Sequence, residues 1–575
     1  MARLAKYINS IAVLIRHHRT YLLFLLGVLL VYTRFVNLPW GFPNLMHPDE
    51  NNMMSSVMQL QCDVRNVRDC LNPHFFAYGQ FSIYLASALS HLLKSILREP
   101  VLSPLHVSLT LRFISAVSSV ITGFYLYKFT KKKIRSDWIS LLSLFFYVCT
   151  PLFIQAAHFG TTESLLMLLL MLTVYYEQAV LLQAFFVGLA VAVKPSGLLF
   201  GIVPLLTLVV QFQKRKNIFR FMFRGILAAM IIVITTFIGS PHYFIHFTDF
   251  IGTFQYESSV ATGAMRVFYT EQFAQTLPIV FQFHRVLPYT IGWGTMLLGV
   301  VGMVISLKKY RFHVFVFSLF FLYNSLLYAK WTRFIVPYMP LFIFFAMVST
   351  YTLYVNLKKH TNIVIATIFL LVFSVYQMII GVAYLSIYQS PDVRTTATNW
   401  IIATLPQNKK MLSESANVVD VPLGYTGKYQ YYNPFINDID GNQELRKSVM
   451  SALRTTDFLI IPSRRVFADY TCYRSVNYKK TGNIVRTSIY SSHISLDKDC
   501  NKTELSYPAL HEYYTEVLGN KNAYELLAEF SSYPKLTVLN ITLLEFPDEL
   551  AEETWTVFDH PVIRVYRRVN SGIPL

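Results

Sequence analysis

Residues 362–386 read NIVIATIFLLVFSVYQMIIGVAYLS, an uncharged and mostly apolar run. A helix needs about 20 predominantly apolar residues to cross a membrane, so this run is long enough to span one. It is the last such run in the chain, and it divides the charge. Residues 1–386 hold 30 Lys and Arg against 11 Asp and Glu, whereas residues 387–575 hold 20 against 21. The sequence therefore predicts a basic membrane domain at 1–386 and a neutral, water-soluble α/β domain at 387–575.

The composition of the whole chain agrees with an integral membrane protein. Of its 575 residues, 54% are hydrophobic and 14% are charged, and the mean hydropathy is +0.41. Soluble proteins carry about 25% charged residues. The net charge of +18 does not indicate nucleic-acid binding, because the cations stand in short clusters between apolar stretches and not together beside polar surface. We expect membrane lipids, and no nucleic acid, among the partners.

Charge also decides how many apolar stretches cross the membrane. If every candidate stretch spans and the N-terminus is cytoplasmic, the later basic clusters lie outside, against the positive-inside rule. Treating 75–93 as an embedded or interfacial helix returns every cluster to the inside. We therefore predict a polytopic α-helical protein with juxtamembrane helices and about eleven transmembrane helices, at 21–36, 107–127, 138–157, 163–177, 179–193, 197–212, 222–239, 287–307, 312–329, 334–355 and 362–386.

The first and the shortest of these segments carry further expectations. No small-x-small cleavage site follows 21–36, so this segment is predicted to be an uncleaved span from which Arg34 reaches outward. The segments at 163–177 and 179–193 are short enough to be tilted or to form a re-entrant pair. Both alternatives leave the sidedness of the rest unchanged.

Three regions face the outside in this topology: a first loop at 37–106, a second loop at 240–286, and the domain at 387–575. They contain four of the five cysteines, which suggests Cys62–Cys70 and Cys472–Cys500 disulfides, with unpaired thiols as the alternative. In the last region, apolar patterns predict helices at 443–455 and 522–531 and strands at 458–462, 535–541 and 562–566.

Charged residues are scarce at the predicted outer face, and because a charge in or beside a span is energetically expensive, each one suggests a function. A carboxylate can take a proton from a hydroxyl nucleophile, and Lys or Arg can hold a phosphate. This inventory suits group transfer from a membrane-embedded phosphate ester. Its members are Arg34, Asp49, Glu50, Arg112, Glu163, Lys194, Lys330 and Arg333.

Six motifs around these charges occur in a recognisable order. They are HPDE (47–50), NPHFFAYG (72–79), LRFISAV (111–117), HFGTTE (158–163), GLAVAVKP (188–195) and RFIVPYMP (333–340). In this order, over residues 20–386, the chain resembles the GT-C glycosyltransferases that use polyprenyl-phosphate sugars, in the superfamily of protein O-mannosyltransferases and aminoarabinose transferases. Such enzymes carry juxtamembrane helices in their first outer loop, in keeping with the non-spanning 75–93 segment.

The resemblance implies catalytic roles for three acids. Asp49 matches the base, and Glu50 would support it by a hydrogen bond or contact the acceptor. Glu163 stands where the family usually has Asp, a departure that affects the geometry there. For each acid the plain alternative is a favourable charge at the start of a helix.

Three cations are implied to bind the donor phosphate. Lys194 matches the family's phosphate-contacting lysine, and Arg333 and Arg112 are further candidates. An ordinary interfacial anchor is the alternative for Lys194 and Arg333, and a structural role for Arg112. No set of metal ligands can be identified and no cofactor is certain, although a requirement for a divalent metal ion is left open by the sequence.

The implied activity is inverting transfer of a sugar from a polyprenyl-phosphate donor to a hydroxyl or amine of a protein, lipid or glycan. It would take place on the extracytoplasmic face of the cell (inner) membrane. Two other functions remain: a transporter or flippase of lipid-linked sugars, and a non-catalytic envelope-assembly protein. A transporter would be expected to show inverted repeats and sites near the bilayer midplane.

Overall fold

The computed structural model describes residues 18–62, 67–360, 363–415, 420–479, 485–488, 490–497, 506–519, 523–539 and 541–569. The chain forms two compact units. The membrane unit comprises residues 1–38, 49–265 and 277–381, and the C-terminal unit comprises 39–48, 266–276 and 382–575. Short segments of both predicted outer loops thus belong to the C-terminal unit.

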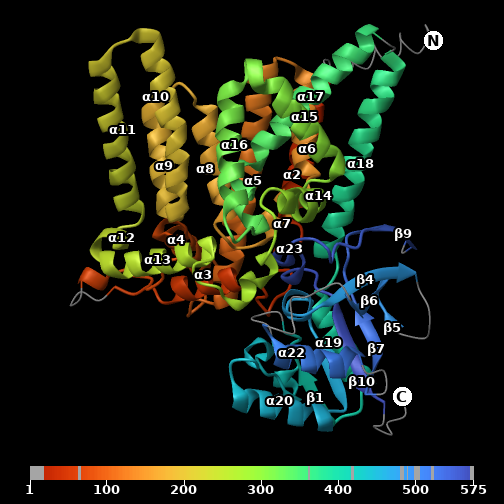
Figure 1. Ribbon diagram of the computed structural model, residues 1–575. Helices are drawn as coiled ribbons and strands as arrows, with labels where there is room; N and C mark the ends of the chain where they lie inside the picture. Colours follow the sequence, from red (N-terminus) through yellow and green to blue (C-terminus); the bar gives the residue numbers. More distant parts are fainter. Residues whose placement is uncertain are drawn as a thin grey trace. The chain divides into compact units, whose positions relative to one another are not determined.

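The membrane unit is a bundle of long helices with shorter helices at one end (Figure 1). The elements of the bundle, long helices and the short turns that continue them, are α2 (Arg19–Phe35), α5 (Pro104–Ile134), α6 (Asp137–Val148), α7 (Pro151–His158), α8 (Glu163–Tyr175), α9 (Val180–Val193), η2 (Pro195–Gly201), α10 (Ile202–Arg215), α11 (Ile218–Gly239), η4 (Gln282–Val286), α14 (Leu287–Thr290), α15 (Trp293–Lys309), α16 (Arg311–Leu326), η5 (Thr332–Phe334), η6 (Val336–Tyr338), α17 (Met339–His360) and α18 (Ile363–Gln389).

Each predicted spanning segment falls on one of these helices, and the polytopic helical class is confirmed. Five helices in the described part are long and apolar enough to cross a membrane, or up to seven if each bent pair is one span. The bent pairs are α6 with α7, at 54°, and α14 with α15, at 115°. Helices α2, α8, α9 and α16 are shorter than 18 residues, so the total of eleven spans stays a prediction.

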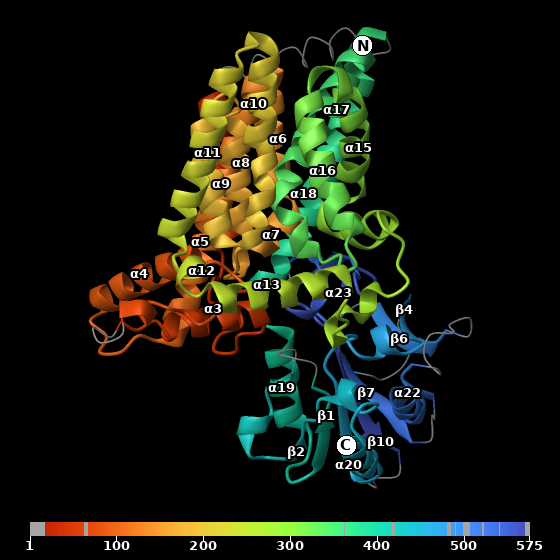
Figure 2. The same cartoon turned by 60° about the vertical axis from the view of Figure 1, so that its left-hand side comes forward.

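The short helices of the outer loops gather at one end of the bundle in both views (Figures 1 and 2). They are α3 (Pro48–Met58), α4 (Gln80–Leu97), α12 (His242–Ile245) and α13 (Phe247–Thr262). Helix α4 covers most of the 75–93 segment. Helix α4 is not among the helices long and apolar enough to span, but several predicted spans are not either, so a non-spanning α4 stays a prediction.

The basic clusters meet at the other end of the bundle. Lys133, at the end of α5, is 2.5 Å from a carboxylate oxygen of Glu177 in the turn between α8 and α9. The same carboxylate lies 3.3 Å from His313 at the start of α16. Arg19, where α2 begins, pairs with Asp137, where α6 begins, at 3.1 Å. The bundle is therefore polarised, as the positive-inside rule requires of a multispanning protein.

The expectation that Arg34 reaches outward is wrong. Its side chain is fully buried and donates to the Ser119 hydroxyl at 3.0 Å and to the carbonyls of Tyr147 and Val148 at 2.8 and 3.2 Å. Helix α6 ends at Val148, and the last carbonyls of a helix lack partners within it. Arg34 satisfies those carbonyls, so it stabilises the break between α6 and α7.

The C-terminal unit contains a six-stranded mixed sheet in the order β2-β1-β3-β10-β7-β5, with helices packed against it. Strands β2, β1 and β3 are parallel, and β10 is antiparallel to both β3 and β7. The elements are α19 (Val393–Thr404), β1 (Lys410–Ser413), β2 (Gln430–Tyr432), α20 (Gln443–Thr455), β3 (Phe458–Ile461), α21 (Phe467–Tyr470), β4 (Tyr473–Lys479), β5 (Val485–Arg486), β6 (Tyr490–Leu496), α22 (Pro508–Tyr514), β7 (Tyr524–Phe530), β8 (Lys535–Val538), β9 (Ile541–Glu545), α23 (Glu553–Val557) and β10 (Ile563–Arg568).

This arrangement confirms the predicted α/β class and corrects one element. The helix predicted at 522–531 is strand β7, which pairs along its length with β10. Leu, Glu and Ala favour a helix in isolation, but pairing with a neighbouring strand outweighs that preference. The helix at 443–455 and the strands at 458–462, 535–541 and 562–566 correspond to α20, β3, β8 and β10.

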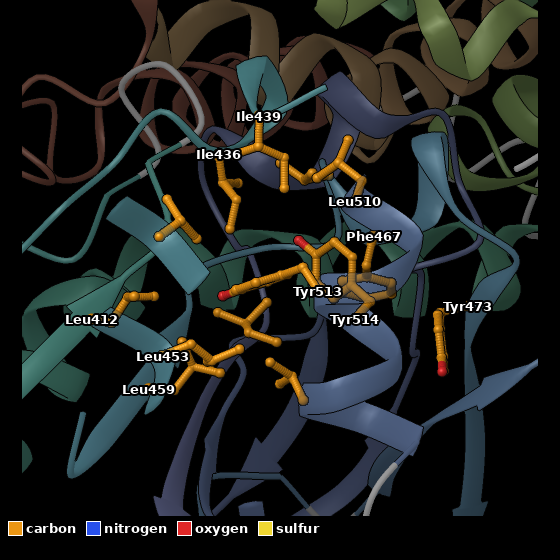
Figure 3. Packing of buried hydrophobic residues seen from close by; sticks show 14 of the residues in the cluster. Leu412, Ile436, Ile439, Leu453, Leu459, Phe467, Tyr473, Leu510, Tyr513 and Tyr514 are labelled. Atoms are coloured by element: carbon orange, nitrogen blue, oxygen red, sulfur yellow. The ribbon is translucent and has the colours of Figure 1, made fainter. Parts of the chain in front are cut away.

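An apolar core packs between the sheet and helices α20 to α22 (Figure 3). Leu412 and Leu459 come from neighbouring strands, and Tyr513 and Tyr514 come from α22. One acid lies inside this core: Glu414, which follows β1, accepts hydrogen bonds from the Tyr513 hydroxyl at 3.2 Å and the Tyr514 hydroxyl at 2.9 Å. Burial raises the pKa of Glu414 to about 8.

The cysteines follow the predicted pattern as far as the structure describes them. Cys62 and Cys70 form a disulfide. Cys472 is also disulfide-bonded, and its predicted partner, Cys500, lies outside the described residues. Cys149 is free and buried.

Candidate functional site

The first turn of α3 carries two neighbouring carboxylates with different surroundings. Pro48 begins the helix, and Asp49 and Glu50 follow it. A proline fits this position because it has no N–H to leave unpaired, and the helix dipole favours the two negative charges. Asp49 remains partly exposed and forms an ion pair with Arg333 of η5.

Glu50 is fully buried and tightly held. The Arg112 guanidinium donates from Nε to Oε1 at 2.6 Å and from Nη2 to Oε2 at 2.8 Å. A third donor of Arg112, Nη1, reaches the Leu38 carbonyl at 2.7 Å. This two-pronged geometry is the strongest that arginine makes with a carboxylate, and it fixes the first turn of α3 against α5.

Gly160 completes the environment of Glu50. Its backbone N–H donates to Oε1 at 3.1 Å. A Cβ atom at this position would lie 2.7 Å from the Leu111 Cβ and 2.8 Å from the Glu50 Oε1. The glycine in the HFGTTE motif is therefore required by the close approach of the α7–α8 turn to α5 and Glu50.

A second ion pair joins the ends of two short helices. Glu163 begins α8, and Lys194 follows the last residue of α9. The Lys194 Nζ lies 3.3 Å from the Glu163 Oε1, and both side chains are largely buried. Lys194 also faces the ring of Tyr78, with 4.9 Å between Nζ and the ring centroid.

The two ion pairs share an aromatic side chain. The Phe334 ring centroid is 5.9 Å from the Lys194 Nζ and 5.9 Å from the Arg333 Cζ, so the two cations lie no more than about 12 Å apart. The Arg333 guanidinium also lies over Trp331, 4.8 Å from its ring centroid. Two cations and two carboxylates, Asp49 and Glu163, therefore meet at the end of the bundle opposite the basic clusters.

The tertiary structure brings together the six residues that the sequence singled out, although they are up to 284 positions apart in the chain. They divide into three ion pairs: Asp49–Arg333, Glu50–Arg112 and Glu163–Lys194. The first and third pairs include partly exposed groups. The second pair is almost entirely enclosed, and its guanidinium is already engaged by a carboxylate.

Several residues of the site were missed by sequence reasoning. Tyr78, Gly160 and Phe334 stand inside the quoted motifs but bear no charge. Glu257 of α13 lies near Lys194; desolvation raises the pKa of Glu257, and the Lys194 charge opposes part of that rise. No sequence signal distinguished Glu257 from the other acids of the second outer loop.

Metal binding has no geometric support in the described part of the chain. Among those residues there is no group of three or more His, Cys, Asp or Glu side chains placed to hold a metal ion.

Comparison with known proteins gives one sequence-level match and several structural neighbours. The chain is similar, over 80% of its length and 95% of the other's, to ArnT from Cupriavidus metallidurans bound to undecaprenyl phosphate, with 12% identity and a TM-score of 0.46. It is also similar to the oligosaccharyltransferase AglB from Archaeoglobus fulgidus in complex with an inhibitory peptide and a dolichol-phosphate, at 11% identity and a TM-score of 0.46, over 96% of this chain and 88% of that one. No curated protein matches the sequence.

The sequence-level match concerns the membrane domain. Residues 106–238 match the model of the dolichyl-phosphate-mannose-protein mannosyltransferase family. This segment contains Arg112, Gly160, Glu163 and Lys194, and thus three of the quoted motifs in full. The match confirms the resemblance to the GT-C glycosyltransferase superfamily that the ordered motifs indicate.

Proposed function

We propose that the protein transfers a sugar from a polyprenyl-phosphate donor to a hydroxyl or amine acceptor on the extracytoplasmic side of the membrane. The observation that carries the proposal is the meeting of the Asp49–Arg333 and Glu163–Lys194 pairs around one aromatic ring. A base and a paired cationic site for phosphate are the two features that this reaction requires.

The reaction is a single displacement. The Asp49 carboxylate accepts the proton of the acceptor O–H or N–H, and the acceptor atom forms a bond to the anomeric carbon. The bond from that carbon to the phosphate oxygen breaks, and its electron pair leaves with the polyprenyl phosphate. One displacement inverts the anomeric configuration.

Arg333 and Lys194 have different roles in the proposed reaction. The donor phosphate competes with Asp49 for the Arg333 guanidinium, because arginine binds phosphate and carboxylate with the same fork of N–H donors. Donor binding therefore releases Asp49 to act as base. Lys194, held by Glu163, stabilises the charge that develops on the leaving phosphate.

Glu50 and Arg112 position the base and do not contact substrate in this scheme. Glu50 is fully buried and its carboxylate oxygens are used by Arg112 and Gly160. We therefore assign Arg112 to holding α3 in place, and leave Lys194 and Arg333 as the phosphate ligands.

The sidedness follows from charge. The proposed site lies at the end of the bundle away from the basic clusters, and such clusters favour the cytoplasmic side. The acceptor class, whether protein, lipid or glycan, is to be determined by experiment.

A transfer assay tests the proposal. The full chain would be reconstituted in vesicles with a panel of radiolabelled polyprenyl-phosphate sugars, and membrane extract would supply the acceptor. Wild type should transfer label, Asp49→Asn should lose transfer while still folded, and Asp249→Asn should match wild type. Asp249 is a suitable control because it is an exposed acid on α13.

Other results would overturn parts of the proposal. Equal transfer by wild type and Asp49→Asn would remove Asp49 as base. If labelled lipid crosses the bilayer and no sugar is transferred, the protein is a flippase and not a transferase. Retention of the anomeric configuration in the product would exclude the single displacement.

A further inference from the structure

The hairpin of β8 and β9 in the C-terminal unit exposes an unusual amount of apolar surface. Among the described residues, its two strands pair with each other and with no further strand. The exposed apolar side chains are Val538, Leu539, Ile541, Leu543 and Leu544. An isolated two-stranded hairpin is marginally stable in water, and clustered exposed apolar residues mark interaction surfaces.

The tip of this hairpin has an unexpected residue. Leu539 is 91% exposed and has a φ angle of +49°. Side chains other than Gly, Asn and Asp are uncommon in this left-handed conformation, because the Cβ atom clashes with the backbone. A leucine at this position is unfavourable both for the backbone and for contact with water. An apolar partner at the tip would offset the second of these.

The base of the hairpin lies beside the end of a membrane helix. The Lys535 N–H, where β8 begins, donates to the Ser386 hydroxyl of α18 at 3.2 Å. Ser386 is three residues from the end of α18, and Lys535 pairs with Glu545 at the end of β9, so the base of the hairpin lies beside that end. Only 11% of the most apolar stretch of α18 is buried within the protein, so most of this stretch is left to lipid. The hairpin therefore begins next to the last turns of a helix that is long and apolar enough to span a membrane.

We propose that the β8–β9 hairpin inserts its apolar tip into the interfacial region of the phospholipid bilayer. The partner is a lipid surface because the hairpin starts beside the end of α18, its five exposed apolar side chains are aliphatic, and the sequence has no charged residue from 538 to 544. Aliphatic side chains gain by entering the boundary between headgroups and acyl chains. The hairpin gives the C-terminal unit a membrane contact besides α18, and this inference does not depend on the proposed activity.

Site-directed spin labelling tests this placement. Leu539→Cys would be labelled in the full chain in phosphatidylcholine–phosphatidylglycerol vesicles, with Tyr425→Cys as the control. Tyr425 is 74% exposed and lies in the same unit. The described native cysteines do not compete for the label, because Cys149 is buried and the others are in disulfides. The measured quantities are collision rates with oxygen, which dissolves in lipid, and with a nickel chelate, which stays in water.

The expected ratio of oxygen to nickel collisions is severalfold higher at position 539 than at position 425. Equal ratios at the two positions in vesicles would overturn the proposal. Spin–spin broadening at 539 that disappears on dilution with unlabelled protein would also overturn it, because a second copy of the chain would then cover the tip. The Leu539→Cys variant should fold normally, since this side chain is almost fully exposed.

Discussion

The buried pair of Glu50 and Arg112 provides the sharpest test of how the site is built. Glu50→Gln keeps the shape of the side chain and removes its charge. The amide cannot satisfy both N–H prongs of the guanidinium, which now reach Glu50 at 2.6 and 2.8 Å. Because both partners are almost completely enclosed, the arginine would keep a buried charge without a counter-charge.

The expected loss of stability is large. Removing one partner of a buried ion pair costs about 3–5 kcal/mol. Arg112→Met should cost a similar amount, because it leaves Glu50 buried and charged. The double variant should be less destabilised than the sum of the two, with a coupling energy of about 2–3 kcal/mol.

Unfolding in mixed detergent micelles measures these differences, with the six tryptophans of the chain as the fluorescent probe. Asp49→Asn is the matched control. It changes the neighbouring carboxylate, which is 16% exposed and pairs with an arginine that is 28% exposed, and should lower the unfolding free energy by less than Glu50→Gln does. A Glu50→Gln variant as stable as wild type would refute the reasoning, as would two single effects that simply add.

Three further outcomes follow from the structure. Gly160→Ala should destabilise the protein by about 1–3 kcal/mol, because the added Cβ would lie 2.8 Å from the Glu50 Oε1. Gly252→Ala is the control and should leave the stability unchanged, because no atom lies within 4 Å of its Cβ. Equal effects of the two variants in the same unfolding assay would contradict the prediction. Lys194→Met should lower the turnover of the proposed transfer by about 100-fold with the protein folded, and unchanged turnover would remove Lys194 from the reaction. Burial raises the pKa of Glu414 from 4.5 to about 8, so the stability that this group contributes is fully present below pH 4.5 and is lost as the pH rises through 8. Glu414→Gln imitates the protonated acid and should flatten the dependence of the unfolding midpoint on pH over this interval. An unchanged pH profile would exclude Glu414 as the source of the dependence.

The sequence alone was sufficient for the fold class and for the two-part division of charge. Long uncharged apolar runs are stable only inside a bilayer or a large protein core, and basic clusters in alternate interhelical loops mark the cytoplasmic side of the membrane. The same arithmetic predicts that the 75–93 segment does not span. The same reasoning left eight charged residues at one membrane face, and the resemblance of the ordered motifs reduced them to the six candidates for the site.

Local patterns were less reliable where the partner lies far away in the chain. The segment at 524–530 has helix-forming residues, yet it is a strand because β10 pairs with it. The position of Arg34 predicts that it reaches outward, but its guanidinium is buried because it donates to the carbonyls at the end of α6. In both cases the deciding contact involves residues that no local window contains.

The roles within the site also required the tertiary structure. The sequence places Asp49 and Glu50 side by side and suggests that both serve the same chemistry. In the folded chain Arg112, 62 positions further along, encloses Glu50, while Arg333 pairs with Asp49 at a more open position. Which carboxylate is free to meet a substrate depends on burial and on the placement of distant cations. Composition and motif order therefore determined what kind of protein this is and which residues are candidates for the site, and only the packing of helices decided which of these side chains are enclosed and which are more open.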